Sequence, residues 1–234
     1  MSGDFDDRII TSWHTNAAPW VRAIRQREIV SRVDVTNDAI VSTLRSLRPT
    51  HLLDVGCGEG WLCHAMARDG VSCVGVDVVP ALIDAARASH PVDAVPGTYA
   101  VLAYDAIATG ALSDHDVGAF DVIVSNFALI GEAPVETMLA ALPALMAPGG
   151  HVVIQTLHPV MASLDVPYVD GWREGSWTGF SSEFADAPPW YFRTISSWVA
   201  LLTQVGLTMR ALHEPVFPET GRPASLILCA NRAD

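Results

Sequence analysis

The chain has 234 residues, of which half are hydrophobic and 17% are charged, a composition typical of a globular protein rather than a disordered or fibrous one. The 14 Lys and Arg and the 26 Asp and Glu residues give a net charge of -12, which argues against a surface that binds duplex nucleic acid. All 14 of these basic residues are Arg, so mechanisms that depend on a lysine are excluded.

The cysteines and the first residues both bear on the cellular compartment of the protein. The four cysteines (Cys57, Cys63, Cys73 and Cys229) form no CxxC pair, and we expect buried, reduced thiols. The start MSGDFDDRII lacks the features of a signal peptide, and no apolar run reaches the ~20 residues that span a bilayer. These features predict a cytoplasmic protein without a membrane span. No HxH or HxxxH spacing occurs, so no metal site is expected.

The first 50 residues are expected to form an N-terminal helical arm. Residues 1–16 are polar and show no clear period, whereas apolar residues recur at helical intervals from Ala17 to about Leu47, with Pro19 in the first turn. Six of the 14 Arg lie between Ala17 and Arg48. A solvated helix face is one interpretation of these arginines, and contact with a bound ligand is the other.

Short apolar strands alternate with helices after this arm. The expected strands are 51–55, 72–76, 98–103, 120–125, 151–156, 207–213 and 224–230. The expected helices are 59–69, 80–89, 134–146 and 195–205, and Pro143 kinks or splits the third. This alternation is typical of βαβ units and predicts a parallel sheet.

Residues 158–192 interrupt the alternation and contain eight of the 18 aromatic residues. A loop of this length inside a compact domain is usually functional or disordered, and the aromatic content argues against disorder. We interpret the insertion as a lid and a wall for a second substrate. The alternative is that its aromatic side chains only pack it onto the core.

A glycine-rich turn follows the first strand, in the stretch from Asp54 to Gly60 (DVGCGEG), and the second strand ends at Asp77, 21 residues after Gly56. Glycines between a strand and a helix let the backbone approach a ligand closely. The carboxylate at the end of the next strand is then placed to bind two ribose hydroxyls. A dinucleotide-binding GxGxxG motif would need glycine where Trp61 stands, which argues against a nicotinamide-dependent dehydrogenase.

The stretch LLDVGCGEGWLCHAMARDGVSCVGVDVVPALIDAAR, from Leu52 to Arg87, resembles the first two motifs of class I S-adenosylmethionine-dependent methyltransferases. The resemblance continues through YDA (104–106), FDVIVSNFAL (120–129) and LMAPGGHVVIQT (145–156), and the whole chain resembles small bacterial members of unassigned substrate. It implies a Rossmann-like, seven-stranded, mostly parallel sheet with helices on both faces. We expect one domain over 1–234, with the arm at 1–50, the cofactor-binding core at 51–157, the insertion at 158–194 and the end of the sheet at 195–234.

The resemblance also implies S-adenosyl-L-methionine as the cofactor. The residues that it places at the methionine portion and near the transferred methyl group are Asp54, Gly56, Cys57, Gly58, Asn126 and Phe127. Those that it places at the ribose and the adenine are Asp77, Val78, Leu82, Asp105 and Ala106. For Asp105 a helix-cap role, and for Asn126 a backbone-capping role, stay open. One of Arg22, Arg25 and Arg32 is expected to pair with the methionine carboxylate, and Trp13 or Trp20 to close over the cofactor.

The acceptor of the methyl group is less constrained. His158 follows the fifth strand directly and is the best candidate for a general base, although Pro159 and the local backbone alone can explain a fixed histidine there. The segment Ser125-Asn126-Phe127-Ala128 replaces the NPPY-like motif of nucleic-acid amino-methylating enzymes. Elimination leaves a small-molecule acceptor, with no membrane partner and no prediction of oligomeric state. The alternative from another class is a module that binds the cofactor without catalysis.

Overall fold

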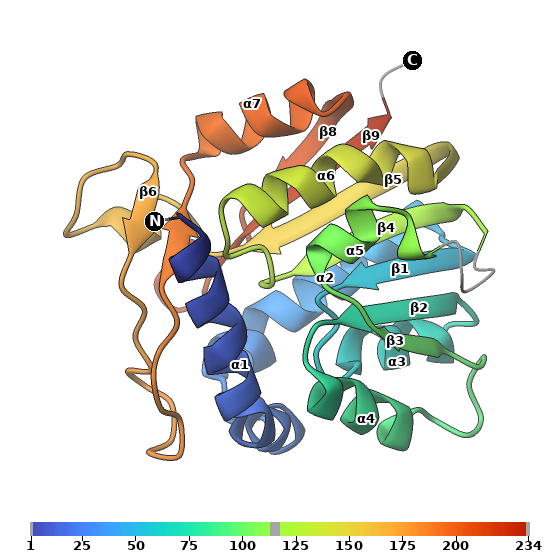
Figure 1. Cartoon of the computed structure of the whole chain (residues 1–234), viewed down its shortest axis with the longest axis horizontal. Helices are drawn as coiled ribbons and strands as arrows, with labels where there is room; N and C mark the ends of the chain where they lie inside the picture. The colour runs from blue at the N-terminus through green and yellow to red at the C-terminus, as the bar shows by residue number, and fades with distance from the viewer. Residues whose placement is uncertain (1, 113–117, 233–234) are drawn as a thin grey trace.

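A seven-stranded sheet runs through the centre of the computed structural model, which describes residues 2–112 and 118–232 (Figure 1). Its strands are β1 (His51–Val55), β2 (Ser72–Asp77), β3 (Thr98–Val101), β4 (Phe120–Asn126), β5 (Met146–Thr156), β8 (Leu207–His213) and β9 (Leu226–Arg232). The helices are α1 (Ser2–Arg25), α2 (Asn37–Leu47), α3 (Trp61–Arg68), α4 (Pro80–Ser89), α5 (Tyr104–Ala108), α6 (Ala133–Leu145) and α7 (Ile195–Gln204). The π-helix η1 (Arg32–Thr36), the 3-10 turn η3 (Met161–Ser163) and a small sheet of β6 (Gly171–Arg173) with β7 (Trp190–Phe192) complete the description.

The strand order of the large sheet is β3-β2-β1-β4-β5-β9-β8. The pairs from β3 to β5 are all parallel, and β9 is antiparallel to both β5 and β8. The predicted seven-stranded, mostly parallel sheet is therefore confirmed. Because β1 pairs with β2 on one side and with β4 on the other, the strand order reverses at β1. Open α/β sheets bind ligands beside the carboxyl ends of the strands at such a reversal.

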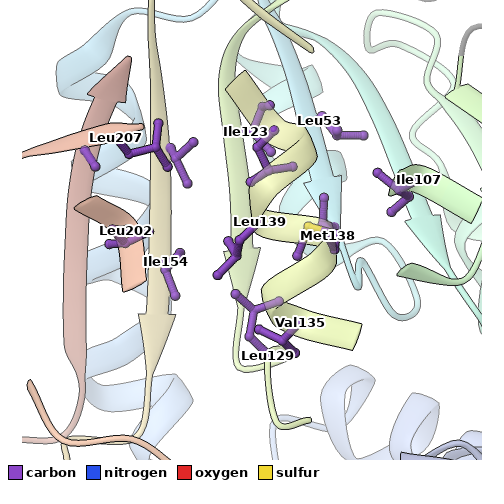
Figure 2. Close-up of a cluster of buried hydrophobic side chains, with 14 of the residues drawn as sticks. Leu53, Ile107, Ile123, Leu129, Val135, Met138, Leu139, Ile154, Leu202 and Leu207 are labelled. Carbon is purple, nitrogen blue, oxygen red and sulfur yellow. The ribbon is translucent and has the colours of Figure 1, made fainter. Parts of the chain in front are cut away.

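Helices cover both faces of the sheet, which explains why its inner strands are apolar on both sides. Adjacent residues of β1 serve opposite faces: Leu53 packs in a cluster with α5, α6 and α7, and Leu52 in a cluster with α2, α3 and α4. Figure 2 shows part of the first cluster, including Leu53, Ile123, Met138 and Leu139. Both Leu52 and Leu53 are fully buried. No helix among the described residues is long and apolar enough to cross a membrane.

The N-terminal arm differs from the expectation. The helix expected from Ala17 to Leu47 begins at Ser2 and ends at Arg25, with η1 and α2 following, and Pro19 lies inside α1. Residues near the start of α1 show no apolar period because two of its buried side chains are polar. Ser12 and Asn16 are buried through hydrogen bonds to the insertion. Such a face is invisible to a test that counts apolar residues.

Smaller corrections concern strand ends. The fifth strand begins at Met146 rather than His151, with an irregularity: Phe120 pairs with Met146, and Val122 with His151. The residues from Pro148 to Gly150 thus form an extra segment within β5. Pro143 does not split α6, since the helix runs through to Leu145.

Helix α1 lies across the end of the sheet toward which β4 and β5 point, and the insertion lies beyond it (Figure 1). Phe5 stacks on Trp172 with ring centroids 4.7 Å apart. Trp13 and Trp177 pack edge to face, with ring centroids 5.9 Å apart. Asn16 exchanges two hydrogen bonds with the backbone of Ala185, of 2.7 and 2.9 Å. The insertion is therefore packed against α1 by aromatic and polar contacts together.

Candidate active site

The glycine turn after β1 wraps around the end of β2. The N–H groups of Gly56 and Cys57 both donate to the carbonyl oxygen of Val76, at 2.8 and 3.0 Å. Gly56 and Gly58 have φ angles of +76° and +56°, in the left-handed region that favours glycine. A Cβ added to Gly56 would lie 2.3 Å from the Cβ of Ala128, so no other residue fits there without a rearrangement.

Asp77, at the end of β2, holds this turn from the other side. Its carboxylate accepts one hydrogen bond from the N–H of Gly58 and one from the N–H of Val79, both at 2.9 Å. Burial raises the pKa of Asp77, and the backbone hydrogen bonds oppose that rise. The structure thus brings Asp77 directly onto the glycine turn.

Arg32 approaches the same turn from η1. Its guanidinium lies over the rings of Trp20 and Trp61, 5.5 and 4.9 Å from their centroids. Burial lowers the pKa of Arg32 to about 10, while the negative charges of Glu59 and Asp54 act in the opposite direction. Burial also raises the pKa of Asp54 to about 7 and raises that of Glu59. One cation and two carboxyl groups are therefore buried together beside the turn.

This group of charges is not satisfied internally. Three of its buried side-chain atoms have no hydrogen-bond partner among the described residues: Arg32 Nη2, Asp54 Oδ1 and Glu59 Oε1. The same is true of Asn126 Oδ1, at the neighbouring end of β4. A buried polar atom left without a partner costs roughly 1–3 kcal/mol. Several such atoms in one place are characteristic of a site for a polar ligand.

The segment after β2 contributes an apolar surface. Val79 and Leu82 are buried in a small cluster with Ala17 of α1, and Val78, Trp13 and Trp20 pack against that cluster. Trp20 also reaches the glycine turn itself, since its Nε1 lies 3.5 Å from the position of a Cβ added to Gly58. Trp20 therefore brings α1 of the N-terminal arm against the glycine turn.

Asp105 and Phe127 lie on separate segments at this edge, Asp105 in α5 and Phe127 in the loop after β4. Asp105 is exposed in the first turn of α5, where its carboxylate accepts a hydrogen bond of 2.8 Å from the N–H of the next residue, Ala106; the N-cap position of this helix is Ala103. Phe127 has a φ of +57°, which is rare for a residue with a side chain and is common at functional sites. Its N–H donates to the carbonyl of Gln155, which ties the loop after β4 to the end of β5.

The three candidate arginines of the arm have different partners. Arg22 pairs with Glu183 and Ser181 of the insertion, and Arg25 donates to Ser89 of α4. Arg32 alone of the three stands beside the glycine turn, close to Glu59 and Asp54. The structure therefore separates one ligand candidate from two arginines that hold α1 in place.

His158 is buried just beyond β5, with its side chain 3% exposed. Its Nε2–H donates to the carboxylate of Glu214, at 2.7 Å, while Nδ1 is buried and unpartnered among the described residues. The ring is thus held by a carboxylate that lies 56 residues further along the chain.

Sequence reasoning missed Glu59, Tyr104 and Glu214. The hydroxyl group of Tyr104 donates to the carbonyl of Ala128 at 3.0 Å and lies 3.5 Å from the position of a Cβ on Gly56. Glu59 and Tyr104 stand inside the quoted motifs, so their position was a usable signal. Glu214 had no such signal, because only the folded sheet brings it to His158. In the described part of the chain, no group of three or more His, Cys, Asp or Glu side chains is placed to hold a metal ion.

Comparison with known proteins gives a consistent result. A sequence model that describes a methyltransferase domain matches residues 24–212. The chain is 32% identical over 121 residues to a ubiquinone biosynthesis O-methyltransferase from Alkalilimnicola ehrlichii, a match that covers 52% of this chain and 47% of that protein. The chain spans about half the length of the curated relatives that it matches first.

Two solved structures share the fold. A 1,6-didemethyltoxoflavin-N1-methyltransferase from Burkholderia thailandensis, with 1,6-didemethyltoxoflavin and S-adenosylhomocysteine bound, matches with a TM-score of 0.67 and 18% identity over 100% of this chain and 91% of that one. A magnesium protoporphyrin IX methyltransferase from Synechocystis, with S-adenosylhomocysteine bound, matches with a TM-score of 0.66 and 15% identity, over 97% of this chain and 100% of that one.

Proposed function

This chain belongs to the methyltransferase-domain family, and from that premise we propose that it transfers a methyl group from S-adenosyl-L-methionine to a small-molecule acceptor. The cofactor, when bound, supplies a methyl group on a positively charged sulfur, already activated for in-line displacement. The residues of the chain then have to bind it, align the acceptor and exclude water. The observation that carries the proposal is the set of unpartnered buried polar atoms around the glycine turn.

These atoms suit the methionine end of the cofactor, which has an ammonium and a carboxylate group. Asp54 Oδ1 and Glu59 Oε1 are free acceptors for the ammonium. Arg32 Nη2 is a free donor for the carboxylate, and guanidinium binds carboxylates with favourable geometry. We therefore assign the methionine carboxylate to Arg32 rather than to Arg22 or Arg25, whose side chains have partners elsewhere.

The nucleoside end is assigned to the other side of the turn. Each oxygen of Asp77 already accepts one backbone N–H and retains a lone pair for a ribose hydroxyl. The apolar side chains of Val78 and Leu82 are proposed to contact the adenine. The remaining proposed contacts are with Gly56, Cys57 and Gly58 along the cofactor chain, Asp105 and Ala106 at the adenine amino group, and Asn126 and Phe127 near the methyl group.

A small-molecule acceptor is supported by the relatives and by the charge of the chain. The Burkholderia enzyme was solved with a small heteroaromatic acceptor, 1,6-didemethyltoxoflavin. The net charge of -12 works against binding a polyanion. Helix α1 and the insertion cover the edge where the acceptor must enter, and we propose that they form the wall that excludes water from it.

Isothermal titration tests cofactor binding, with S-adenosylhomocysteine and NAD as the two ligands. We expect the wild type to bind the first and not the second. Asp77→Asn should weaken S-adenosylhomocysteine binding by roughly 1–3 kcal/mol, because the ribose hydroxyls lose an ionised partner. Asp84→Asn is the matched control, since Asp84 is an exposed carboxylate on α4 that forms an ion pair with Arg87. Binding of NAD without S-adenosylhomocysteine binding would refute the proposal.

Turnover then separates an enzyme from a module that binds the cofactor and does no chemistry. The protein is incubated with methyl-labelled S-adenosylmethionine and a mixture of phenols, amines and thiols, and the labelled products are identified by mass spectrometry. A labelled product that requires the protein, and is absent with Asp77→Asn at low cofactor concentration, supports catalysis. Binding without any transfer supports the module instead.

A further inference from the structure

His158 and Glu214 meet at the edge of the sheet where the strands from β1 to β5 end. His158 lies two residues after β5, and Glu214 directly follows β8. Because β9 is antiparallel to both strands, β5 and β8 run in the same direction and end at the same edge. The pair is therefore on the edge that carries Asn126 and Phe127, on the side away from Asp77.

The bond between the two side chains determines which ring nitrogen of His158 carries the proton. An ionised carboxylate only accepts hydrogen bonds, so Nε2 must be the donor in the 2.7 Å contact with Glu214. A neutral imidazole has a single N–H, which leaves a free lone pair on Nδ1. That nitrogen is buried and has no hydrogen-bond partner among the described residues.

Another histidine of the same chain shows what a purely structural role looks like. Both ring nitrogens of His90 have partners, Nδ1 with the hydroxyl of Tyr99 and Nε2 with the carbonyl of Val95, each at 2.9 Å. His158 instead has one nitrogen held by a carboxylate and a basic nitrogen left over. That arrangement matches a general base with an orienting group.

We propose that His158 Nδ1 is the general base of the methyl transfer and that Glu214 is the residue that positions it. This inference rests on the proposed function and adds the acceptor class, a compound methylated on a hydroxyl group. As the hydroxyl oxygen forms its bond to the methyl carbon, the methyl–sulfur bond breaks and its electron pair stays on sulfur. The hydroxyl proton moves to Nδ1, and the carboxylate of Glu214 balances the charge of the imidazolium. Water removes the proton afterwards.

The class of acceptor follows from the need for a base. A neutral amine attacks with its own lone pair and can lose its proton to water after the transfer. A neutral hydroxyl is a poor nucleophile until its proton leaves, so it gains most from a base held in place. Phenols vary widely in acidity at nearly constant shape, which makes them suitable probes.

The first test needs no acceptor. Nitrogen NMR of histidine-labelled protein, with His158→Gln used to identify the signal, reports which ring nitrogen carries the proton. We expect the Nε2–H form of His158 in the wild type and a mixture of both forms in Glu214→Gln, whose amide can donate as well as accept. Glu214→Asp should restore the wild-type form at least in part. A wild-type ring protonated on Nδ1 overturns the proposal.

The second test uses a series of phenols, from weakly acidic catechol and methylphenols to nitrophenols that are ionised at the assay pH. His158→Gln should lower kcat for the weakly acidic phenols by roughly a hundredfold or more, and much less for the nitrophenols, which bring no proton to remove. Glu214→Gln should show the same selectivity with a smaller loss. His213→Gln is the control, because His213 is the exposed neighbour of Glu214 on β8.

The outcomes distinguish the two proposals. A loss that is equal for all phenols shows a structural role for His158 and overturns the base. Binding of S-adenosylhomocysteine with no transfer to any hydroxyl compound overturns the acceptor class. Failure to bind S-adenosylhomocysteine at all contradicts the proposed function itself, whatever form His158 takes.

Discussion

The indole N–H of Trp20 donates a 3.1 Å hydrogen bond to the carboxylate of Glu59, 39 residues further along the chain. Trp20 belongs to α1, and Glu59 to the glycine turn. This bond fixes the helix that covers the sheet edge directly to the turn that is proposed to bind the cofactor. It is also among the few hydrogen bonds that the buried Glu59 side chain has, since its Oε1 is unpartnered among the described residues.

Trp20→Phe keeps most of the ring and removes the donor. We expect the free energy of unfolding to fall by roughly 1–3 kcal/mol, because a buried carboxylate loses its hydrogen bond. Urea unfolding measures the change. Trp13→Phe is the matched control, because Trp13 contacts Trp20 and Trp177 through its ring and, within residues 2–112 and 118–232, no indole hydrogen bond is found for it. Equal losses in the two variants would show that ring packing, rather than the bond to Glu59, is responsible.

Gly56→Ala and Gly70→Ala separate backbone strain from close contact. Both residues have positive φ, +76° and +88°, so each alanine should cost roughly 1–2 kcal/mol for the left-handed conformation. Only at Gly56 does the new Cβ also clash, at 2.3 Å from Ala128 Cβ, whereas nothing lies within 4 Å at Gly70. We expect Gly56→Ala to be clearly less stable in thermal melts and to lose S-adenosylhomocysteine binding. Similar melts for both would mean that the loop after β4 yields easily.

The stability of the unliganded protein should fall as pH rises from about 4 to 7. Burial raises the pKa of Asp54 from its usual 3.8 to about 7, so the folded state keeps a proton that the unfolded state has already released. The whole loss amounts to on the order of 4 kcal/mol, and it levels off about one pH unit above the folded-state pKa. Asp54→Asn cannot titrate and should lose correspondingly less stability between pH 5 and pH 8.

Urea unfolding of both proteins at these two pH values measures the difference. Burial also raises the pKa values of Glu59 and Asp77, so these residues change the stability with pH in the same direction as Asp54. Both residues remain in the variant. The comparison therefore isolates Asp54. If the two proteins change in parallel, the folded state ionises Asp54 at its ordinary pH.

Asn16→Ala should loosen the insertion without unfolding the sheet. The buried Asn16 amide bonds both the N–H and the carbonyl of Ala185, and its loss leaves the N–H without that partner, while the carbonyl keeps a 2.9 Å hydrogen bond from the indole N–H of Trp177. Hydrogen exchange should speed up around 178–188 and stay unchanged in β1 and β4. Thr15→Ala is the control, since the exposed Thr15 hydroxyl donates to the carbonyl of Thr11 in its own helix. An exchange rate around Ala185 that equals the wild type would show that the other contacts of the insertion hold it without Asn16.

The sheet was predictable from the sequence because its strands are short apolar runs bounded by glycine or aspartate. Helix α4 and strand β8 were predicted with the bounds that the structure has, 80–89 and 207–213. The glycine spacing and Asp77 were equally visible, since both depend on local order along the chain. The order of residues along a short segment therefore predicts a turn and the two elements that flank it.

The rest depends on contacts between distant segments. The first half of α1 was missed because Ser12 and Asn16 are buried by hydrogen bonds to the insertion rather than by apolar packing. The choice of Arg32 among three arginines, and the pairing of His158 with Glu214, require the positions of α1 and β8 on the sheet. No periodicity in either segment specifies its partner.

The contact between Asn16 and Ala185 joins residues that are 169 positions apart. A ribosome that adds ~5–20 residues each second makes the second partner roughly ten to thirty seconds after the first. During that time α1, with Phe5 and Trp13 on its surface, has been synthesised without the aromatic residues of the insertion that it later packs against. The covered edge of the sheet is therefore among the last parts of the molecule to be completed during translation, and chains that stop before residue 185 lack that cover.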